Sequence, residues 1–341
     1  MKLLQLIAGG EKGGAENFFV RLVRALDEQQ VQQQAVIRKN IDRSNALRKN
    51  NIAVYYAPYC GKLDIFSPHI IKKVAEEFKP DIVMSWMNRA SSVVPVGNWI
   101  NVGRLGGYYN LKYYKKCHHL ICNTQDIRDY VIKQGWPDKR SWYLPNFADE
   151  KMSAPMNRDK FNTPEGVPLV VSFGRLHENK AFDVLIKAVA EVEDVFLWIV
   201  GEGPLRRKLE KLVSDLSIQS RVRFLGWQQD VASIYATGNI FVCPSRHEPL
   251  GNVILEAWVH KLPVIAANSQ GPSQLIENEK NGLLVSIDDV YQLSNAIKEL
   301  VINQSLSESL ASCGNVTYKH NFSKQAVIRK YMNFFDGICR R

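Results

Sequence analysis

The chain has 341 residues, of which 45% are hydrophobic and 23% charged, a composition typical of a globular protein with room for two domains. No run of 18 consecutive apolar residues occurs, so no helix is expected to span a bilayer. The six cysteines lack the spacing of a disulfide framework, which favours a reduced, cytoplasmic setting.

Positive charge is concentrated in the first half of the chain. Of the net charge of +10, residues 1–150 carry +8 (22 Lys and Arg against 14 Asp and Glu), which leaves 22 against 20, or +2, for the rest. A basic surface attracts an anionic membrane, an acidic glycolipid or nucleic acid. No nucleic-acid motif is present, so no nucleic acid is expected as a partner. The basic bands at 38–49 and 112–116 are candidates for membrane contact, and each also fits a solvated face.

Strands and helices alternate from the start of the chain. An apolar strand at 3–8 leads into G-G-E-K-G-G-A-E, which opens a helix at 15–27. Such a turn can cradle a phosphate, but G-x-G-x-x-G and a complete P-loop are both missing, and a plain glycine-rich turn fits equally well. This alternation predicts a doubly wound parallel sheet, a first domain over residues 1–147. Its further strands are expected at 35–37, 52–56, 82–86, 99–102, 119–123 and 141–144, with helices near 43–50, 67–78, 110–117 and 124–134.

A polar stretch with several turn-forming residues, 148–167, is expected to be a linker. A second α/β domain is then predicted over 168–322, and a last amphipathic helix within 323–341. Two such domains are expected to face each other across a cleft and to bind ligands at the carboxyl ends of their strands. The second set of strands is expected at 169–173, 195–200, 222–225, 240–244, 264–267 and 282–285, with helices near 180–192, 204–217, 229–237, 252–260 and 289–302.

Two cations follow the first strand of the second domain. Phe173-Gly174-Arg175 ends that strand, and Glu178-Asn179-Lys180 opens the next helix. Arg175 and Lys180 beside helix N-termini would suit a diphosphate that gains charge as it leaves. On its own this spacing is weak, because loop cations are usually just solvated.

The stretch R-H-E-P-L-G-N-V-I-L-E, residues 246–256, holds two acids. Glu248 precedes a proline, so it is expected on a loop, exposed just outside a helix that begins near Asn252. That helix is apolar nearly all round, which predicts that Glu256 is buried and needs a polar partner. Gly251 allows a ligand to approach the backbone at the helix N-terminus. Taken alone, Glu248 is more simply interpreted as a solvated loop acid, and Glu256 as a salt-bridged core acid.

Two more turns and one apparent metal motif remain. The turns at Gly201 and at Trp227 could hold a nucleobase, or could be ordinary turns with a core aromatic. The run Cys117-His118-His119…Cys122 is too short to bring four ligands around one zinc ion, so buried thiols are expected there. No Asp-x-Asp occurs, so no metal-bridged diphosphate is expected.

These motifs together resemble a known family. G-R-L-H-E-N-K, G-E-G-P, F-L-G-W and the pair Glu248…Glu256 resemble the retaining glycosyltransferases of family four, which have the GT-B fold, over residues 169–285. R-L-G-G-Y-Y-N-L-K-Y-Y-K-K-C and S-R-H-E-P-L-G-N-V-I-L-E-A-W are similar to bacterial lipopolysaccharide core glycosyltransferases. The resemblance implies a metal-independent enzyme whose final helix crosses back to the first domain.

The resemblance also implies residue roles. Arg175 and Lys180 would hold the donor diphosphate, Glu248 the donor sugar and Glu256 the ribose. Further donor contacts would come from Gly13, Gly14, Gly201, Trp227, Leu250, Gly251 and Asn252.

One departure concerns the first domain, where many relatives place a histidine beside the sugar. The matching region here reads G-R-L-G-G-Y-Y and contains none, so Arg104 or Tyr108 is expected to replace it.

The sequence therefore predicts a retaining hexosyltransferase that moves mannose, glucose or a similar sugar from a nucleotide sugar to a glycolipid, in the lipopolysaccharide core. It is expected to work at the inner face of the cytoplasmic membrane, with no cofactor. The alternatives are a non-catalytic sugar-nucleotide-binding protein and an epimerase or phosphorylase of similar fold. An NAD oxidoreductase is disfavoured because the dinucleotide fingerprint is absent.

Overall fold

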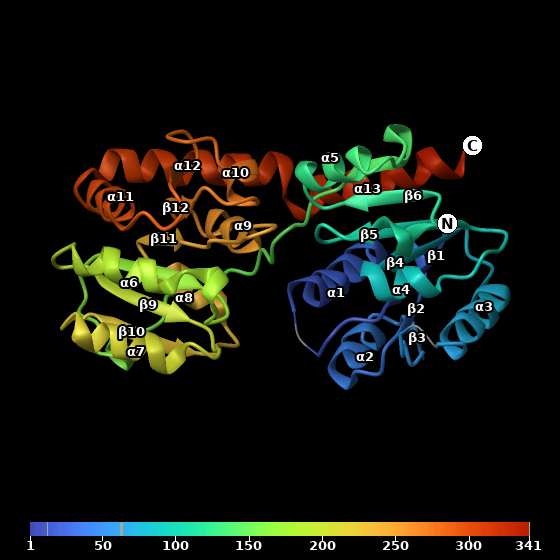
Figure 1. Cartoon of the computed structure of the whole chain (residues 1–341), viewed down its shortest axis with the longest axis horizontal. Coiled ribbons are helices and arrows are strands. Elements are labelled where there is room, and N and C mark those ends of the chain that lie inside the picture. The colour runs from blue at the N-terminus through green and yellow to red at the C-terminus, as the bar shows by residue number, and fades with distance from the viewer. Residues whose placement is uncertain (12, 62–63, 341) are drawn as a thin grey trace. The chain divides into compact units, whose positions relative to one another are not determined.

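The computed structural model describes residues 1–11, 13–61 and 64–340 and divides into two compact units (Figure 1). Unit 1 comprises Met1–Phe147 and Lys324–Arg341, and unit 2 comprises Ala148–Ser323. The final helix thus belongs to the same unit as the N-terminal half of the chain. No helix in the described part of the chain is long and apolar enough to cross a membrane.

Unit 1 is built on a parallel sheet of seven strands in the order β3-β2-β1-β4-β5-β6-β7. All seven strands were predicted from the sequence, within about three residues at their ends. They are β1 (Lys2–Ile7), β2 (Gln32–Ile37), β3 (Ala53–Tyr56), β4 (Ile82–Trp86), β5 (Ile100–Leu105), β6 (His119–Cys122) and β7 (Ser141–Tyr143).

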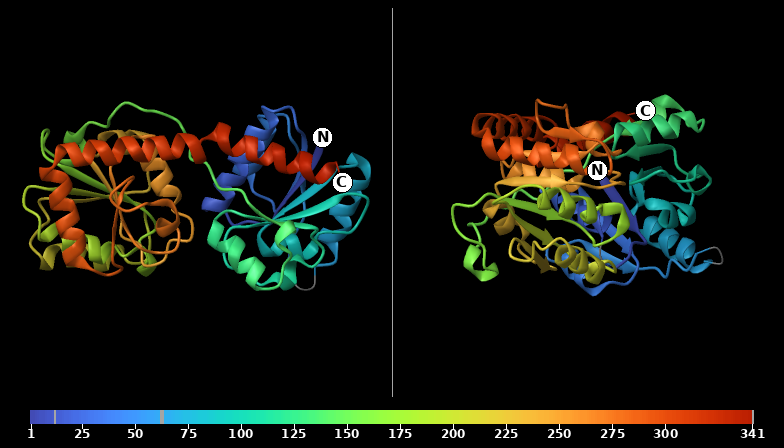
Figure 2. Two further views of the ribbon diagram at one scale, coloured as in Figure 1. Left: turned by 90° about the horizontal axis from the view of Figure 1, so that it is seen from above. Right: turned by 60° about the vertical axis from the view of Figure 1, so that its left-hand side comes forward.

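Helices cover both faces of this sheet, as a doubly wound sheet requires. Helix α13 lies beside α1, and its apolar residues join the core on that face (Figure 2). Helices α3 and α4 pack on the opposite face. The expected helix at 110–117 is a short 3-10 turn, and α4 was not predicted. The helices are α1 (Gly14–Asp27), α2 (Ile41–Arg48), α3 (Phe66–Phe78), α4 (Met87–Val93), α5 (Gln125–Lys133) and α13 (Lys324–Cys339).

Unit 2 has a parallel sheet of six strands in the order β10-β9-β8-β11-β12-β13. Alternate residues of each strand enter two separate cores, with α6, α7 and α11 on one face and α8, α9 and α12 on the other. The strands are β8 (Leu169–Phe173), β9 (Phe196–Val200), β10 (Val222–Gly226), β11 (Ile240–Cys243), β12 (Val264–Ala267) and β13 (Leu283–Val285). The helices are α6 (Phe182–Ala190), α7 (Arg206–Asp215), α8 (Val231–Thr237), α9 (Asn252–Val259), α10 (Pro272–Leu275), α11 (Val290–Ile302) and α12 (Gln304–Asn321).

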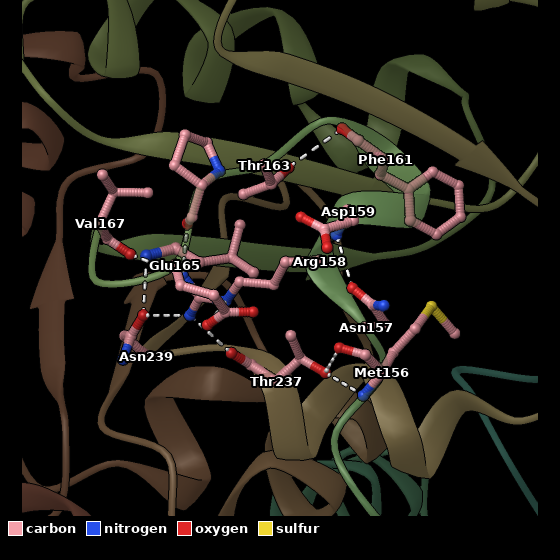
Figure 3. A network of polar contacts seen from close by, with 12 residues as sticks. Met156, Asn157, Arg158, Asp159, Phe161, Thr163, Glu165, Val167, Thr237 and Asn239 are labelled. Atoms are coloured by element: carbon pink, nitrogen blue, oxygen red, sulfur yellow. Dashed lines mark hydrogen bonds and ion pairs between the residues drawn. The ribbon is translucent and has the colours of Figure 1, made fainter.

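The segment expected to be a linker, 148–167, is packed on unit 2. Arg158, which is only 7% exposed, donates to the carbonyl oxygens of Val167 (2.7 Å) and Thr237 (3.0 Å) and to Oδ1 of Asn239 (3.0 Å; Figure 3). These contacts fix the segment to the amino edge of the sheet, opposite the edge where the predicted site residues lie. This part of the segment is therefore packed structure of unit 2.

Candidate functional site

Lys180 and Glu248 form an ion pair at the carboxyl edge of the unit 2 sheet. Their loops follow β8 and β11, which are neighbouring parallel strands, so both emerge at the same edge. Lys180 lies at the end of the 3-10 helix η4 (Glu178–Lys180), and its aliphatic stem crosses Gly174. Burial disfavours the charged form of Lys180, but the charge and hydrogen bond of Glu248, together with Cys243, outweigh burial, and the pKa of Lys180 is raised above its ordinary value. The site therefore holds a fixed positive charge at neutral pH.

Glu248 was expected to be an exposed loop acid, and the structure corrects this: it is 8% exposed. It does lie on a loop before α9, as predicted from the following proline. The loop folds back so that Gly251 N–H donates to Glu248 Oε1 (3.3 Å) and Gly271 N–H donates to the Glu248 carbonyl (2.6 Å). Gly251 has φ +73°, a backbone conformation that favours glycine and that lets α9 begin directly behind the carboxylate.

Glu256 was expected to be buried, and it is instead half-buried. The apolar side of α9 faces the core, and the half-exposed residues Asn252, Glu256 and His260 follow one another at intervals of four, which places them on one stripe of the helix. Tyr235 Oη donates to Glu256 Oε2 (3.2 Å), which supplies a polar partner from the protein itself. This stripe could have been recognised in the sequence, because its polar residues are spaced four apart, as on one face of a helix.

Arg175 is exposed on the loop after β8. Within the described residues, no hydrogen bond or ion pair joins it to Glu248, so the structure brings only Lys180 of the two predicted cations into contact with this acid. The Arg175 loop is held by its neighbour: Leu176 N–H donates to the Glu202 carbonyl (3.0 Å). Gly201, with φ +136°, lies so close to this loop that a Cβ would stand 2.0 Å from the Gly174 carbonyl oxygen.

The aromatic residue predicted to stack on a base, Trp227, follows β10 and is 66% exposed. Strand β10 lies at the sheet edge beyond β9, two strands from β8. The indole is therefore displayed at the same carboxyl edge of unit 2 as Lys180, and its role in base binding stays a prediction.

Arg246 joins the loops of this edge, a role that the sequence analysis missed. It donates to both carboxylate oxygens of Asp183 (3.0 and 2.7 Å) and to the carbonyl of Glu178 (2.8 Å), and its Nε lies 2.6 Å from Asp288 Oδ1. The Glu248 loop is thereby fixed to the segment that carries Lys180. Because Asp183 and Asp288 are distant from Arg246 in sequence, only the nearness of Arg246 to Glu248 could have indicated this role.

The predicted residues of unit 1 have different environments. Gly13 and Gly14 lie at the N-terminus of α1, as expected. Tyr108 is 38% exposed and donates to Asp126, and its contact with a sugar stays a prediction. Arg104 is 2% exposed inside the core, so the expectation that it contacts a sugar is corrected.

Comparison with known proteins identifies the chain. The model of the family "Glycosyl transferases group 1" matches residues 153–320. Two lipopolysaccharide core biosynthesis glycosyltransferases of Rhizobium meliloti (strain 1021), LpsE and LpsD, are each 38% identical to this chain. The alignment with LpsE covers 95% of this chain and 96% of LpsE, and the alignment with LpsD covers 100% of both chains. The chain belongs to the glycosyl transferases of group 1.

This glycosyltransferase also matches solved structures along its length. HepE of Anabaena, crystallised with UDP, aligns with a TM-score of 0.87 and 20% identity over 99% of this chain and 100% of that one. The GT-B fold predicted from the sequence, with two Rossmann-like parallel-sheet domains, is confirmed, and so is the resemblance to lipopolysaccharide core glycosyltransferases.

The apparent zinc motif of the glycosyltransferase consists of buried thiols, as predicted, and of imidazoles that accept hydrogen bonds. Burial raises the pKa of Cys117 and of Cys122 to about 12. His118 Nδ1 accepts from the Asn101 amide (2.8 Å), and His119 Nδ1 accepts from the Trp142 indole (3.2 Å). In the described part of the chain, no three His, Cys, Asp or Glu side chains are grouped to hold a metal ion.

Proposed function

We propose that this glycosyltransferase moves a hexose-type sugar, such as mannose or glucose, from a nucleoside diphosphate to a glycolipid of the lipopolysaccharide core, with retention at the anomeric carbon and without a metal. The observation that carries the proposal is the ion pair of Lys180 with the buried Glu248. A cation and an acid held together at the carboxyl ends of parallel strands suit a ligand with both a diphosphate and hydroxyl groups. Two relatives that align over nearly their whole length, LpsE and LpsD, are named for lipopolysaccharide core biosynthesis, and HepE is seen with UDP.

In the proposed reaction, Lys180 and Arg175 bind the diphosphate oxygens and Glu248 accepts a hydrogen bond from a sugar hydroxyl. The bond from the anomeric carbon to the diphosphate breaks, and the acceptor oxygen bonds to the same face of that carbon. The acceptor proton passes to a diphosphate oxygen. Because negative charge grows on the leaving diphosphate, the two cations stabilise the transition state more than the bound donor.

The test is a panel of UDP, GDP and ADP sugars with lipopolysaccharide core lipid, in buffer with and without EDTA. We expect one donor to yield a new glycoside with its anomeric configuration kept, as read by NMR. Lys180→Ala is expected to lower turnover by about 10²–10³-fold with the fold intact. Binding of sugar nucleotides without any transfer would reject the proposal.

We further propose that the enzyme works at an anionic membrane surface, on the inner face of the cytoplasmic membrane. The support is the net charge of +8 on residues 1–150. Liposome flotation is expected to recover more enzyme with acidic lipid than with neutral lipid. This difference is expected to shrink at high salt, because salt screens the attraction. Equal recovery with both lipids would reject this part.

A further inference from the structure

The ring of Tyr235 in α8 is held in the core of unit 2 by two other rings. The residue is 1% exposed. Its ring stacks with the ring of Phe173, at a centroid distance of 4.1 Å and an interplanar angle of 17°, and with the imidazole of His260, at 5.3 Å and 5°. Closely packed rings cannot change rotamer freely. The hydroxyl group of Tyr235 is therefore carried by a fixed ring.

This hydroxyl group lies against α9, where it meets an acid. Tyr235 Oη is 3.2 Å from Glu256 Oε2 and 3.3 Å from the carbonyl oxygen of Val253, one turn earlier in the helix. A phenol has one proton to donate, and a carboxylate is a stronger acceptor than a carbonyl group. Tyr235 therefore donates to Glu256 and fixes one oxygen of its carboxylate.

The position of Glu256 connects it with the candidate site. Helix α9 begins at Asn252, shortly after Glu248, and Glu256 follows one turn into the helix. Glu256 is half-buried, on the same stripe of α9 as Asn252 and His260. A carboxylate that is partly open to solvent, close to a site proposed for a diphosphate, can accept hydrogen bonds from hydroxyl groups of the same ligand.

We propose that Tyr235 is a positioning residue for nucleotide binding: its hydroxyl group holds the Glu256 carboxylate in the orientation that accepts hydrogen bonds from the ribose hydroxyls of the donor. The inference rests on the proposed function and on the ribose role that the family resemblance implies for Glu256. A glutamate side chain that becomes ordered only when the ligand arrives costs binding free energy. Because Tyr235 orders this side chain in advance, the ribose contact becomes stronger without any contact between the tyrosine and the nucleotide.

The experiment compares the binding of two nucleotides to the full chain by calorimetry. UDP, GDP and ADP are first tested on the wild-type protein, and the tightest binder is then compared with its dideoxyribose form, which lacks both ribose hydroxyls. Wild type is expected to bind the ribose form at least about tenfold more tightly, because the dideoxyribose form loses charge-assisted hydrogen bonds to Glu256.

Tyr235→Phe keeps the stacked ring and removes only the hydroxyl group. It is expected to lower the ratio of the two affinities to about threefold or less, because Glu256 must then be ordered by the ligand. Its affinity for the dideoxyribose form is expected to stay within about twofold of wild type, because that ligand offers Glu256 no hydroxyl group.

Glu256→Ala tests whether the hydroxyl group of Tyr235 acts through this acid. Glu256→Ala alone is expected to bring the ratio to within about twofold of one. Adding Tyr235→Phe to Glu256→Ala is then expected to change nothing further, because the hydroxyl group has no carboxylate left to hold. A purely structural role of Tyr235 would weaken both nucleotides equally and leave the ratio at its wild-type value, and that result overturns the proposal.

Tyr318→Phe is the matched control. Tyr318 is also buried in unit 2, at 3% exposed, and its Oη donates to another glutamate, at Glu150 Oε1 (3.0 Å). This variant is expected to leave both affinities within about twofold of wild type, because neither residue belongs to the proposed ribose contact. Circular dichroism checks that every variant is folded. A loss of discrimination in Tyr318→Phe as large as in Tyr235→Phe overturns the proposal.

The outcomes separate this inference from the proposed function. If wild type binds none of the three diphosphates, the proposed function is rejected and this inference with it. If wild type binds one of them but does not discriminate against its dideoxyribose form, Glu256 makes no ribose contact, and only this inference is overturned.

Discussion

Arg246 and Asp183 are joined by two parallel hydrogen bonds, of 3.0 and 2.7 Å, across 63 positions of sequence. Asp183 lies in the first turn of α6, directly after the segment that carries Lys180, and Arg246 lies two residues before Glu248. Burial raises the pKa of Asp183, but the hydrogen bonds and charge of Arg246, together with a backbone hydrogen bond and Lys187, outweigh burial, so the pKa of Asp183 is lowered overall. The pair therefore sets the distance between the two loops that form the site.

We expect Arg246→Lys to lower kcat about tenfold with a smaller effect on KM for the donor, because lysine cannot donate two parallel hydrogen bonds to one carboxylate. Steady-state kinetics with the identified donor measure both. Wild-type kcat in this variant would show that the pair does not position the site.

The control for this variant is Lys211→Ala. Lys211 pairs with Asp215 on α7 at 2.7 Å, but both side chains are more than half exposed. Exposed ion pairs contribute little, so kcat and stability are expected to stay near wild type.

The raised pKa of Lys180 gives a stability prediction with a definite sign. A folded-state pKa above the unfolded value stabilises the protein fully below the unfolded pKa, and this contribution is lost as pH rises through the folded pKa. We therefore expect wild type to lose stability relative to Lys180→Met as pH rises above about 10.4, the ordinary lysine pKa. Urea unfolding of both proteins at several pH values measures the difference. A constant difference up to pH 12 contradicts the assignment.

Every strand of both sheets was predicted from the sequence, because buried parallel strands are short apolar runs between turns. The prediction failed for α12, whose residues include several poor helix formers, Gly314 among them. This helix forms because it packs on α9, where a Cβ at Gly314 would stand 2.3 Å from the indole of Trp258. Tertiary packing of that kind leaves no local signal.

For the candidate site, the sequence predicted Lys180 and Glu248, which the structure brings into contact, but it misjudged the burial of Glu248. A loop position suggested that Glu248 is exposed, yet Lys180 and the Gly251 amide, brought by other segments and by the backbone turn, enclose it. Arg104 was expected at the surface for a similar reason: its partners, Tyr331 of α13 and Asn146 after β7, come from other segments. The burial of a side chain depends on which segments pack together, and the sequence alone does not show which segments those are.

Two Gly→Ala substitutions in consecutive helices are expected to have opposite signs. Gly314→Ala should destabilise the protein by about 1–3 kcal/mol, because its methyl group would overlap the Trp258 ring. Gly337→Ala should stabilise it by up to about 1 kcal/mol, because nothing lies within 4 Å of its added Cβ and alanine favours helix. Urea unfolding measures both. Equal effects of the two variants would contradict the close packing of α12 on α9.

Arg158→Ala is expected to destabilise unit 2 by about 3 kcal/mol, because buried carbonyl acceptors at Val167 and Thr237 lose their donor (Figure 3). Lys160→Ala, an exposed position in the same short helix, is the control and should change stability by less than about 0.5 kcal/mol. The unfolding midpoint in urea measures both. Equal midpoints would show that segment 148–167 is a loose linker after all.

Tyr331→Phe tests how α13 is anchored in unit 1. Tyr331 Oη accepts from Arg104 Nε (2.9 Å), Asn146 Oδ1 accepts from Arg104 Nη2 (2.6 Å), and the guanidinium lies 4.4 Å from the Trp86 ring centroid. Removing the hydroxyl leaves a buried cationic donor unpaired, so we expect a loss of about 1.5–3 kcal/mol in unfolding free energy. Tyr291→Phe, at a tyrosine 75% exposed, is the control and should be neutral. Stability equal to wild type in Tyr331→Phe would mean that the apolar face of α13 alone holds this helix on the sheet.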